Sequence, residues 1–253
     1  MLNFDAYGAA SAAPPILIAH GLFGSARNWG AIAKRLADTR RVIAPDMRNH
    51  GASPWSDTHD YPAMATDLAK LIEAEGAPAD LVGHSMGGKA AMSLALTRPE
   101  LVRRLVVADI APVAYGHSQA PLIAAMRGLD LSGVTRRGEA DARLAGSIPE
   151  PGVRAFLLQS LDLKADPPRW RLNLDVLDAE MDRIIGWPEP AGAFDGPALF
   201  LAGGASDYLT RNHRPAIKAQ FPQAHFAKLP GAGHWLHVDK PREFEATLRA
   251  FLG

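Results

Sequence analysis

The feature that most constrains the fold of this chain is a G-x-S-x-G motif formed by Gly83, Ser85 and Gly87. An apolar, strand-like run at 79–82 enters the motif, and a helix-like run at 89–97 leaves it. A strand-to-helix turn this sharp forces its central residue into a strained backbone conformation, and glycines on either side remove side chains that would clash there. The pattern therefore predicts that the Ser85 hydroxyl stands clear of a sheet edge, at the start of a helix.

Two other interpretations of the same stretch have to be weighed. Gly83, Gly88 and Lys89 have the spacing of a phosphate-binding loop, but the next residue is Ala90 where that motif needs Ser or Thr to hold magnesium. The second alternative is a glycine-rich turn without chemistry, because G-x-S-x-G also occurs by chance. The rest of the chain decides between a nucleophile and a plain turn.

Composition excludes several functional classes. The chain has 253 residues with 27 Lys plus Arg and 27 Asp plus Glu, so it has no net charge to attract nucleic acid or an anionic membrane. It has no cysteine, which excludes disulfides, thiolate catalysis and cysteine-based metal sites. The N-terminus lacks the basic start and apolar core of a signal peptide, and prolines and glycines interrupt the uncharged stretch at 6–26. We expect a cytoplasmic, soluble protein without a membrane span.

Strand-like and helix-like runs alternate along most of the sequence. This alternation predicts an α/β fold with a mainly parallel central sheet and helices on both faces. The predicted strands lie at 16–19, 41–44, 79–82, 105–108, 198–202 and 225–229, and the helices at 25–37, 62–75, 89–97, 215–221 and 241–252.

Four polar residues follow the ends of predicted strands: His20, Asp46, Ser85 and Asp109. In parallel sheets, ligands bind beyond the carboxyl ends of the strands. We therefore expect these side chains to converge on one edge of the sheet.

The alternation stops between residues 112 and 192. Strand-like runs disappear there, and 121–127, 153–161 and 172–185 resemble short helices separated by prolines. We interpret 112–192 as a helical cap inserted into an α/β core made of 1–111 and 193–253. The alternative is a helical part of the core without a gating role.

A serine hydroxyl needs an adjacent imidazole to act as a nucleophile, and His234 is the candidate. It follows the last predicted strand in a glycine-rich loop, and it completes the chain order nucleophile, acid, base. His84 adjoins the serine but is expected to be structural. The spacing from His234 to His237 is too short for the helical zinc motif, so we predict no metal.

The imidazole also needs a carboxylate to fix its tautomer. Asp109 and Asp207 both follow predicted strands, and both can reach the loop of His234. Sequence spacing alone does not choose between them.

Together these motifs resemble the α/β-hydrolase superfamily along the whole chain. Several stretches are similar, more narrowly, to the small esterases grouped with abhydrolase-domain protein 11. The matching segments are D-M-R-N-H-G at 46–51, G-H-S-M-G-G-K at 83–89, D-I-A-P-V at 109–113 and G-A-G-H-W at 231–235, supported by Y-P-A-M at 61–64 and W-R-L-N at 170–173. The resemblance implies Asp109 as the acid, although Asp207 stands where other members of the superfamily place theirs.

An oxyanion hole is expected beside the serine. The backbone N–H of Met86 lies at a predicted helix N-terminus, where an oxyanion is stabilised. The loop pattern after His20 makes the N–H of Leu22 the second donor. Phe23, Ser206 and Trp235 are the candidate substrate-binding residues.

The function predicted from these residues is a serine carboxylesterase that forms an acyl-enzyme and needs no cofactor. Its substrates would be short- to medium-chain acyl esters, including thioesters, as the family resemblance also implies. Acyl transfer or perhydrolysis on the same triad is the alternative, and a non-catalytic binding protein is a more distant one. We expect a monomer or homodimer. The expected acyl pocket consists of Leu122, Ile123, Met126, Phe156, Leu157 and Leu158 in the insertion.

Overall fold

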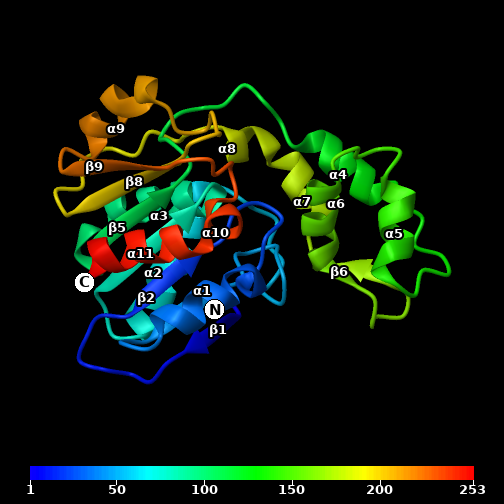
Figure 1. The fold of residues 1–253 in the computed structure, drawn as a ribbon, viewed down its shortest axis with the longest axis horizontal. Coiled ribbons are helices and arrows are strands. Elements are labelled where there is room, and N and C mark those ends of the chain that lie inside the picture. Colours follow the sequence, from blue (N-terminus) through cyan, green and yellow to red (C-terminus); the bar gives the residue numbers. More distant parts are fainter.

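A seven-stranded sheet lies at the centre of the computed structural model, which describes all 253 residues (Figure 1). The strand order is β1-β3-β2-β4-β5-β8-β9, and every neighbouring pair is parallel except the antiparallel β1–β3 pair at one edge. The predicted α/β fold with a mainly parallel sheet is therefore confirmed. The strands are β1 Phe4–Tyr7, β2 Ile16–Ala19, β3 Val42–Pro45, β4 Ala79–His84, β5 Val102–Ala108, β8 Ala198–Gly203 and β9 Ala224–Leu229.

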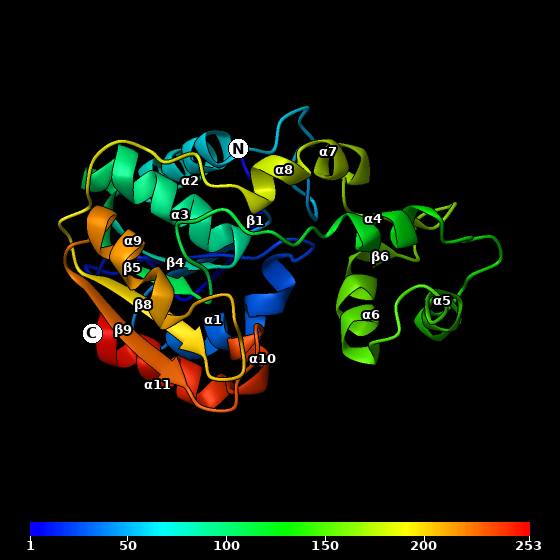
Figure 2. The same ribbon diagram turned by 90° about the horizontal axis from the view of Figure 1, so that it is seen from above.

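Helices cover both faces of this sheet (Figure 2). One face packs against α1 Gly30–Leu36, α10 Leu236–Asp239 and α11 Pro241–Leu252, and the other against α2 Tyr61–Ala74, α3 Met86–Thr97 and α9 Arg214–Gln220. Successive residues of a strand point to opposite faces, so a strand covered on both sides is apolar throughout. This explains why the central strands appear in the sequence as mainly apolar runs rather than as alternating patterns. Short 3-10 helices occupy Ala26–Trp29, Pro99–Leu101, Leu158–Ser160 and Arg211–His213.

The segment between β5 and β8 forms a helical lobe beside the sheet (Figure 1). Its helices are α4 Ala120–Arg127, α5 Arg137–Leu144, α6 Pro151–Leu157, α7 Leu174–Ala179 and α8 Met181–Ile185.

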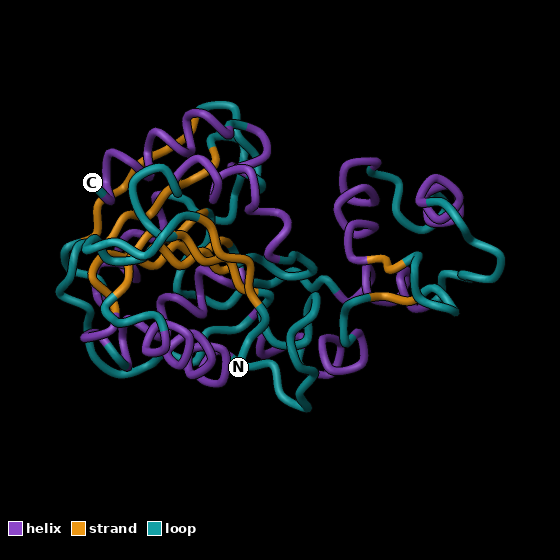
Figure 3. The backbone as a smooth tube through the Cα atoms, turned by 90° about the horizontal axis from the view of Figure 1, so that it is seen from below, coloured by secondary structure: helices purple, strands orange, loops and turns teal.

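Two details of this lobe differ from the sequence prediction. The lobe contains a small antiparallel sheet of two residues per strand, β6 Leu161–Asp162 and β7 Arg169–Trp170, which lies apart from the main sheet (Figure 3). Strands this short have too few residues to show a period-two pattern. Helix α5 was not predicted, because only Ala140 and Leu144 of its eight residues are buried, which leaves little apolar periodicity to detect.

Candidate active site

Ser85 follows β4 at a turn whose backbone is strained. Its φ of 52° and ψ of −122° lie in a region that residues with a side chain rarely adopt. A Cβ atom at Gly83 would lie 2.3 Å from the carbonyl oxygen of Gly87, and one at Gly87 would lie 2.4 Å from the carbonyl oxygen of Ala19. Both separations are far below van der Waals contact, so the turn requires the two glycines. The result is a serine held at the end of β4, against the first turn of α3.

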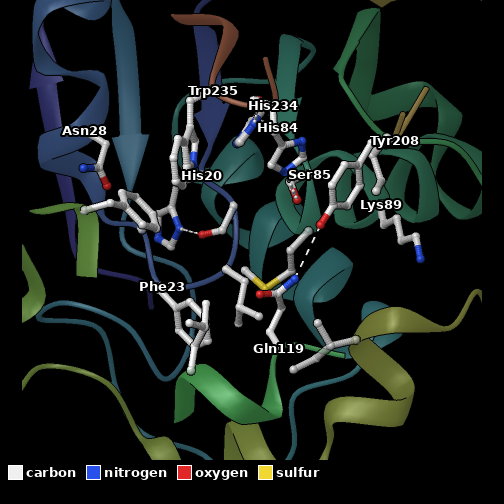
Figure 4. Close-up of a pocket in the computed structure, with 18 of the residues that line it drawn as sticks. His20, Phe23, Asn28, His84, Ser85, Lys89, Gln119, Tyr208, His234 and Trp235 are labelled. Atoms are coloured by element: carbon white, nitrogen blue, oxygen red, sulfur yellow. Dashed lines mark hydrogen bonds between the residues drawn. The ribbon is translucent and has the colours of Figure 1, made fainter. Parts of the chain in front are cut away.

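Three side chains from separate strand ends form a continuous hydrogen-bonded chain. Nε2 of His234 lies 3.0 Å from Oγ of Ser85, and Nδ1 of His234 lies 2.8 Å from Oδ2 of Asp109. A carboxylate only accepts hydrogen bonds, so Nδ1 carries the proton and Nε2 offers its lone pair to the serine hydroxyl. This is the tautomer that a general base for Ser85 needs. Figure 4 shows His234 beside the serine at the edge of a pocket.

The carboxylate of Asp109 is fully buried and has further partners. Its Oδ1 accepts the N–H of Gly203 at 2.9 Å, and its Oδ2 accepts the hydroxyl of Ser206 as well as His234. These bonds keep the carboxylate aimed at the imidazole. Asp207, the competing acid, has an exposed side chain, and His234 makes no hydrogen bond with it.

Ser206 occupies a place different from the one expected of a substrate-binding residue. Its hydroxyl donates a hydrogen bond to the carboxylate of Asp109, and the residue is not part of the cavity wall.

Two backbone N–H groups flank the serine. Met86 opens α3 and Leu22 lies in the turn after β2, and neither N–H donates to another backbone group. The Leu22 turn runs directly against the nucleophile, because a Cβ atom at Gly21 would lie 3.2 Å from Cβ of Ser85. Both N–H groups are therefore available to a charge that develops next to Ser85.

Two buried histidines hold this turn in place, and the sequence analysis did not assign them that role. The Nε2 atoms of His20 and His50 accept the backbone N–H groups of Met47 at 2.9 Å and Phe23 at 3.1 Å. His20 donates from Nδ1 to the carbonyl of Gly21. Burial lowers the pKa of both rings, well below the usual value for His50, so each stays neutral with one donor and one acceptor.

His84 supports the loop of His234 from the other side. Its Nε2 donates to the backbone carbonyl of His234 at 2.8 Å, which fixes the loop that carries the imidazole. Burial keeps the pKa of His84 well below the usual value, so this donor remains a neutral ring. The structural role predicted for His84 is consistent with this contact.

Ser85 and His234 line a cavity of about 290 Å³. Hydrophobic residues make up 15 of the 26 that line it, so it suits an apolar acyl chain. Phe23 and Trp235 lie in the lining, as do three of the six residues expected to form an acyl pocket: Leu122, Phe156 and Leu157. The other three, Ile123, Met126 and Leu158, are buried in the core outside the cavity lining.

Lys89 lies in the wall of the same cavity, one helical turn after the serine. Its ammonium donates to the carbonyl oxygens of Ile185 at 2.9 Å and Gly186 at 2.5 Å, at the end of α8, and lies 4.8 Å from the centre of the Tyr115 ring. The side chain is 1 % exposed. Burial lowers the pKa of Lys89 from its usual 10.5 to about 7. Lys89 thus ties the helix behind the nucleophile to the chain that returns from the lobe.

Comparison with known proteins agrees with this architecture. Residues 16–247 match the alpha/beta hydrolase family. The chain belongs to that family. Within the family it belongs to the ABHD11 group: it is 42 % identical over 260 residues to the mouse sn-1-specific diacylglycerol lipase ABHD11, covering 99 % of this chain and 85 % of the mouse protein.

Two further proteins are similar to this hydrolase over most of its length. It is 42 % identical over 240 residues to the Escherichia coli K12 esterase YbfF, covering 93 % of this chain and 91 % of that protein. Among solved structures, a marine microorganism esterase superposes with a TM-score of 0.93 at 38 % identity, covering 99 % of this chain and 98 % of the other.

None of the helices has the length and apolar character needed to cross a membrane. No group of three or more His, Cys, Asp or Glu side chains is arranged to hold a metal ion.

The low pKa of Lys89 predicts a pH-dependent stability. Between about pH 7 and the pKa of an unfolded lysine, about 10.4, the unfolded chain binds a proton that the folded protein does not, so the stability rises with pH. Lys89→Met removes this titration while leaving the other groups in place. Relative to that variant, the free energy of unfolding of the native protein should rise by about 1 kcal/mol per pH unit between pH 7.5 and 9.5, measured by urea unfolding. A constant difference across this range would contradict the prediction.

Proposed function

We propose that this hydrolase is a serine carboxylesterase that acts on short- to medium-chain acyl esters, including thioesters, through an acyl-enzyme. The observation that carries the proposal is the hydrogen-bonded chain of Asp109, His234 and Ser85 beside an apolar cavity. Membership of the family and the lipase and esterase relatives support a carboxylic ester hydrolase. A location in the cytoplasm, a monomeric or homodimeric state and independence from cofactors stay predictions.

Acylation begins when Nε2 of His234 removes the proton of the Ser85 hydroxyl. Oγ then attacks the ester carbonyl carbon, and the carbonyl oxygen becomes an oxyanion in the tetrahedral intermediate. The N–H groups of Leu22 and Met86 donate to this oxyanion, and each such donor typically stabilises the transition state by about 3 kcal/mol. Asp109 stabilises the imidazolium that forms and keeps the ring in the productive orientation.

The second half of the reaction uses the same base. The protonated Nε2 of His234 gives its proton to the leaving alcohol or thiol as the tetrahedral intermediate collapses. A water molecule then takes the place of the leaving group, His234 removes a proton from it, and the resulting hydroxide attacks the acyl-enzyme. As this second intermediate collapses, the bond to Oγ breaks, Oγ takes the proton from Nε2 of His234, and the carboxylic acid is released.

The lobe at 112–192 is proposed to act as a cap over a core made of 1–111 and 193–253. It supplies Leu122, Phe156 and Leu157 to the cavity, and the core supplies Phe23 and Trp235. An acyl chain would lie between these two groups of apolar side chains, with its carbonyl at Ser85.

Acyl transfer is the second candidate function, and one relative favours it. The yeast protein named a probable alcohol acetyltransferase is 35 % identical to this chain over 266 residues, covering 94 % of this chain and 77 % of the yeast protein. An acetyltransferase would pass the acyl group to an alcohol instead of water. Product analysis during turnover of an acetyl ester in the presence of ethanol distinguishes the two, because a hydrolase yields mainly acetic acid and a transferase mainly ethyl acetate. Perhydrolysis would instead require hydrogen peroxide as the acceptor.

The assignment of the acid predicts unequal effects of two conservative substitutions. Asp109→Asn removes the carboxylate that fixes the tautomer of His234, so kcat for p-nitrophenyl butyrate should fall by about 10³-fold or more. Asp207→Asn alters an exposed residue and should change kcat by no more than about twofold. Equal losses, or the reverse order, would refute the assignment. Ser85→Ala sets the background rate, and circular dichroism checks that each variant is folded.

The lining of the cavity predicts a change in acyl-chain selectivity. Leu122→Trp fills space in the proposed acyl site, so kcat/KM for p-nitrophenyl octanoate should fall about tenfold more than for the acetate. Ile123→Val is the matched control, because Ile123 is the next residue of the same helix but is buried outside the cavity lining. A parallel loss for both esters in Leu122→Trp would show that the acyl chain binds elsewhere.

A further inference from the structure

The ring of Tyr208 lies flat against the imidazole of His234. The ring centroids are 3.9 Å apart, and the planes differ by 22°. His84 is the other aromatic neighbour of His234, but its ring is tilted by 43° at 4.8 Å. Tyr208 belongs to the loop after β8, and it lines the same pocket as Ser85 and His234 (Figure 4). One face of the His234 imidazole is therefore covered by a single phenol ring.

Backbone contacts set the position of this ring. The carbonyl oxygen of Tyr208 accepts the hydroxyl of Tyr115 at 2.6 Å, and its N–H donates to Oγ of Ser206 at 3.3 Å. Ser206 in turn donates to Asp109. The same short loop therefore holds both the carboxylate at Nδ1 and the ring that covers the imidazole face. The phenol hydroxyl itself makes only a long contact, 3.5 Å from Nε2 of Gln119.

The stacked geometry leaves the functional atoms of the imidazole free. Nδ1 and Nε2 point outward in the plane of the ring, toward Asp109 and Ser85, while Tyr208 contacts only the face. The ring face of Tyr208 opposes rotation of the imidazole away from its two partners, Asp109 and Ser85. An aromatic face also carries partial negative charge, which attracts a cation placed above it. His234 becomes such a cation in each tetrahedral intermediate.

We propose that Tyr208 is a positioning residue for His234, whose ring face holds the imidazole in line between Asp109 and Ser85 and stabilises its cationic form. This inference rests on the proposed esterase function. The part of the side chain that matters is the aromatic face, and the hydroxyl is secondary.

Several titratable groups face His234 and bear on its pH dependence. Asp109 is hydrogen-bonded to Nδ1 of His234. Two further histidines lie near His234: His84, from the end of β4, and His237, from α10. Burial lowers the pKa of His84 and lowers that of His237 to about 3, so both stay neutral while the base titrates. Burial raises the pKa of Tyr208, and the nearby charges of Asp207 and Asp109 raise it further, which keeps the phenol neutral. Loss of the Tyr208 face is thus the main electrostatic change in a Tyr208 variant.

The test compares Tyr208→Leu with Tyr208→Phe and Tyr208→Trp. Leucine keeps an apolar side chain but has no aromatic face, whereas phenylalanine keeps the face and lacks only the hydroxyl. The measurement is kcat/KM for p-nitrophenyl butyrate between pH 5 and 9, with thermal unfolding to confirm that each variant is folded.

For Tyr208→Leu, kcat/KM should fall by about tenfold, and the midpoint of the acidic limb should move to lower pH by about half a unit. The direction follows because a less stable cation gives up its proton at lower pH. Tyr208→Phe should regain most of the lost activity and the native midpoint, and Tyr208→Trp should give a midpoint at or above the native one.

Equal losses in Tyr208→Leu and Tyr208→Phe, or an acidic limb at the native pH in Tyr208→Leu, would overturn the inference. If Tyr208→Leu does not fold, the Tyr208→Trp variant decides. An acidic-limb midpoint below the native one in Tyr208→Trp would also overturn the inference. A failure of the proposed function is distinguishable, because the native protein itself would then hydrolyse no ester at any pH.

Discussion

The whole site depends on the strained turn at Ser85. The backbone of this residue has a positive φ, and the turn closes only because Gly83 and Gly87 carry no Cβ atom. The same close packing brings the turn after β2 against the serine, so the two free N–H groups of Leu22 and Met86 lie beside Ser85, where the proposed reaction would form an oxyanion. Strain at this point is maintained by the sheet on one side and α3 on the other, which agrees with the general finding that such strain persists only where the surroundings fix it.

Neutral histidines give the site its rigidity. Asp109 is a buried carboxylate with several donors, and the imidazole of His234 is held between it and the serine. Around this pair, His20 and His50 each connect two backbone groups of the loops, and His84 donates to the backbone carbonyl of His234, while burial keeps all three rings uncharged. A neutral imidazole has one donor and one acceptor, and can join two loops without placing a second positive charge beside the base.

The sequence predicts those features that depend on local pattern. Buried parallel strands appear as mainly apolar runs, and the sharp turn at Ser85 appears as a glycine spacing, so the sheet and this turn are predicted without coordinates. The position of His234 follows from the order of the strands. Pattern cannot choose between Asp109 and Asp207, because both follow strands and the choice depends on which side chain is buried. The sequence also does not predict the contact between Tyr208 and His234, because these residues belong to two loops that only the tertiary fold brings together.

The central claim is that Ser85 is an activated nucleophile. The most direct measurement treats the native protein with a fluorophosphonate probe and locates the adduct by peptide mass spectrometry. We expect a single stoichiometric adduct on Ser85, formed together with loss of p-nitrophenyl butyrate hydrolysis. An adduct on another residue, or folded protein that forms none, would contradict the account, because the hydrogen-bonded chain through His234 would then not activate the serine.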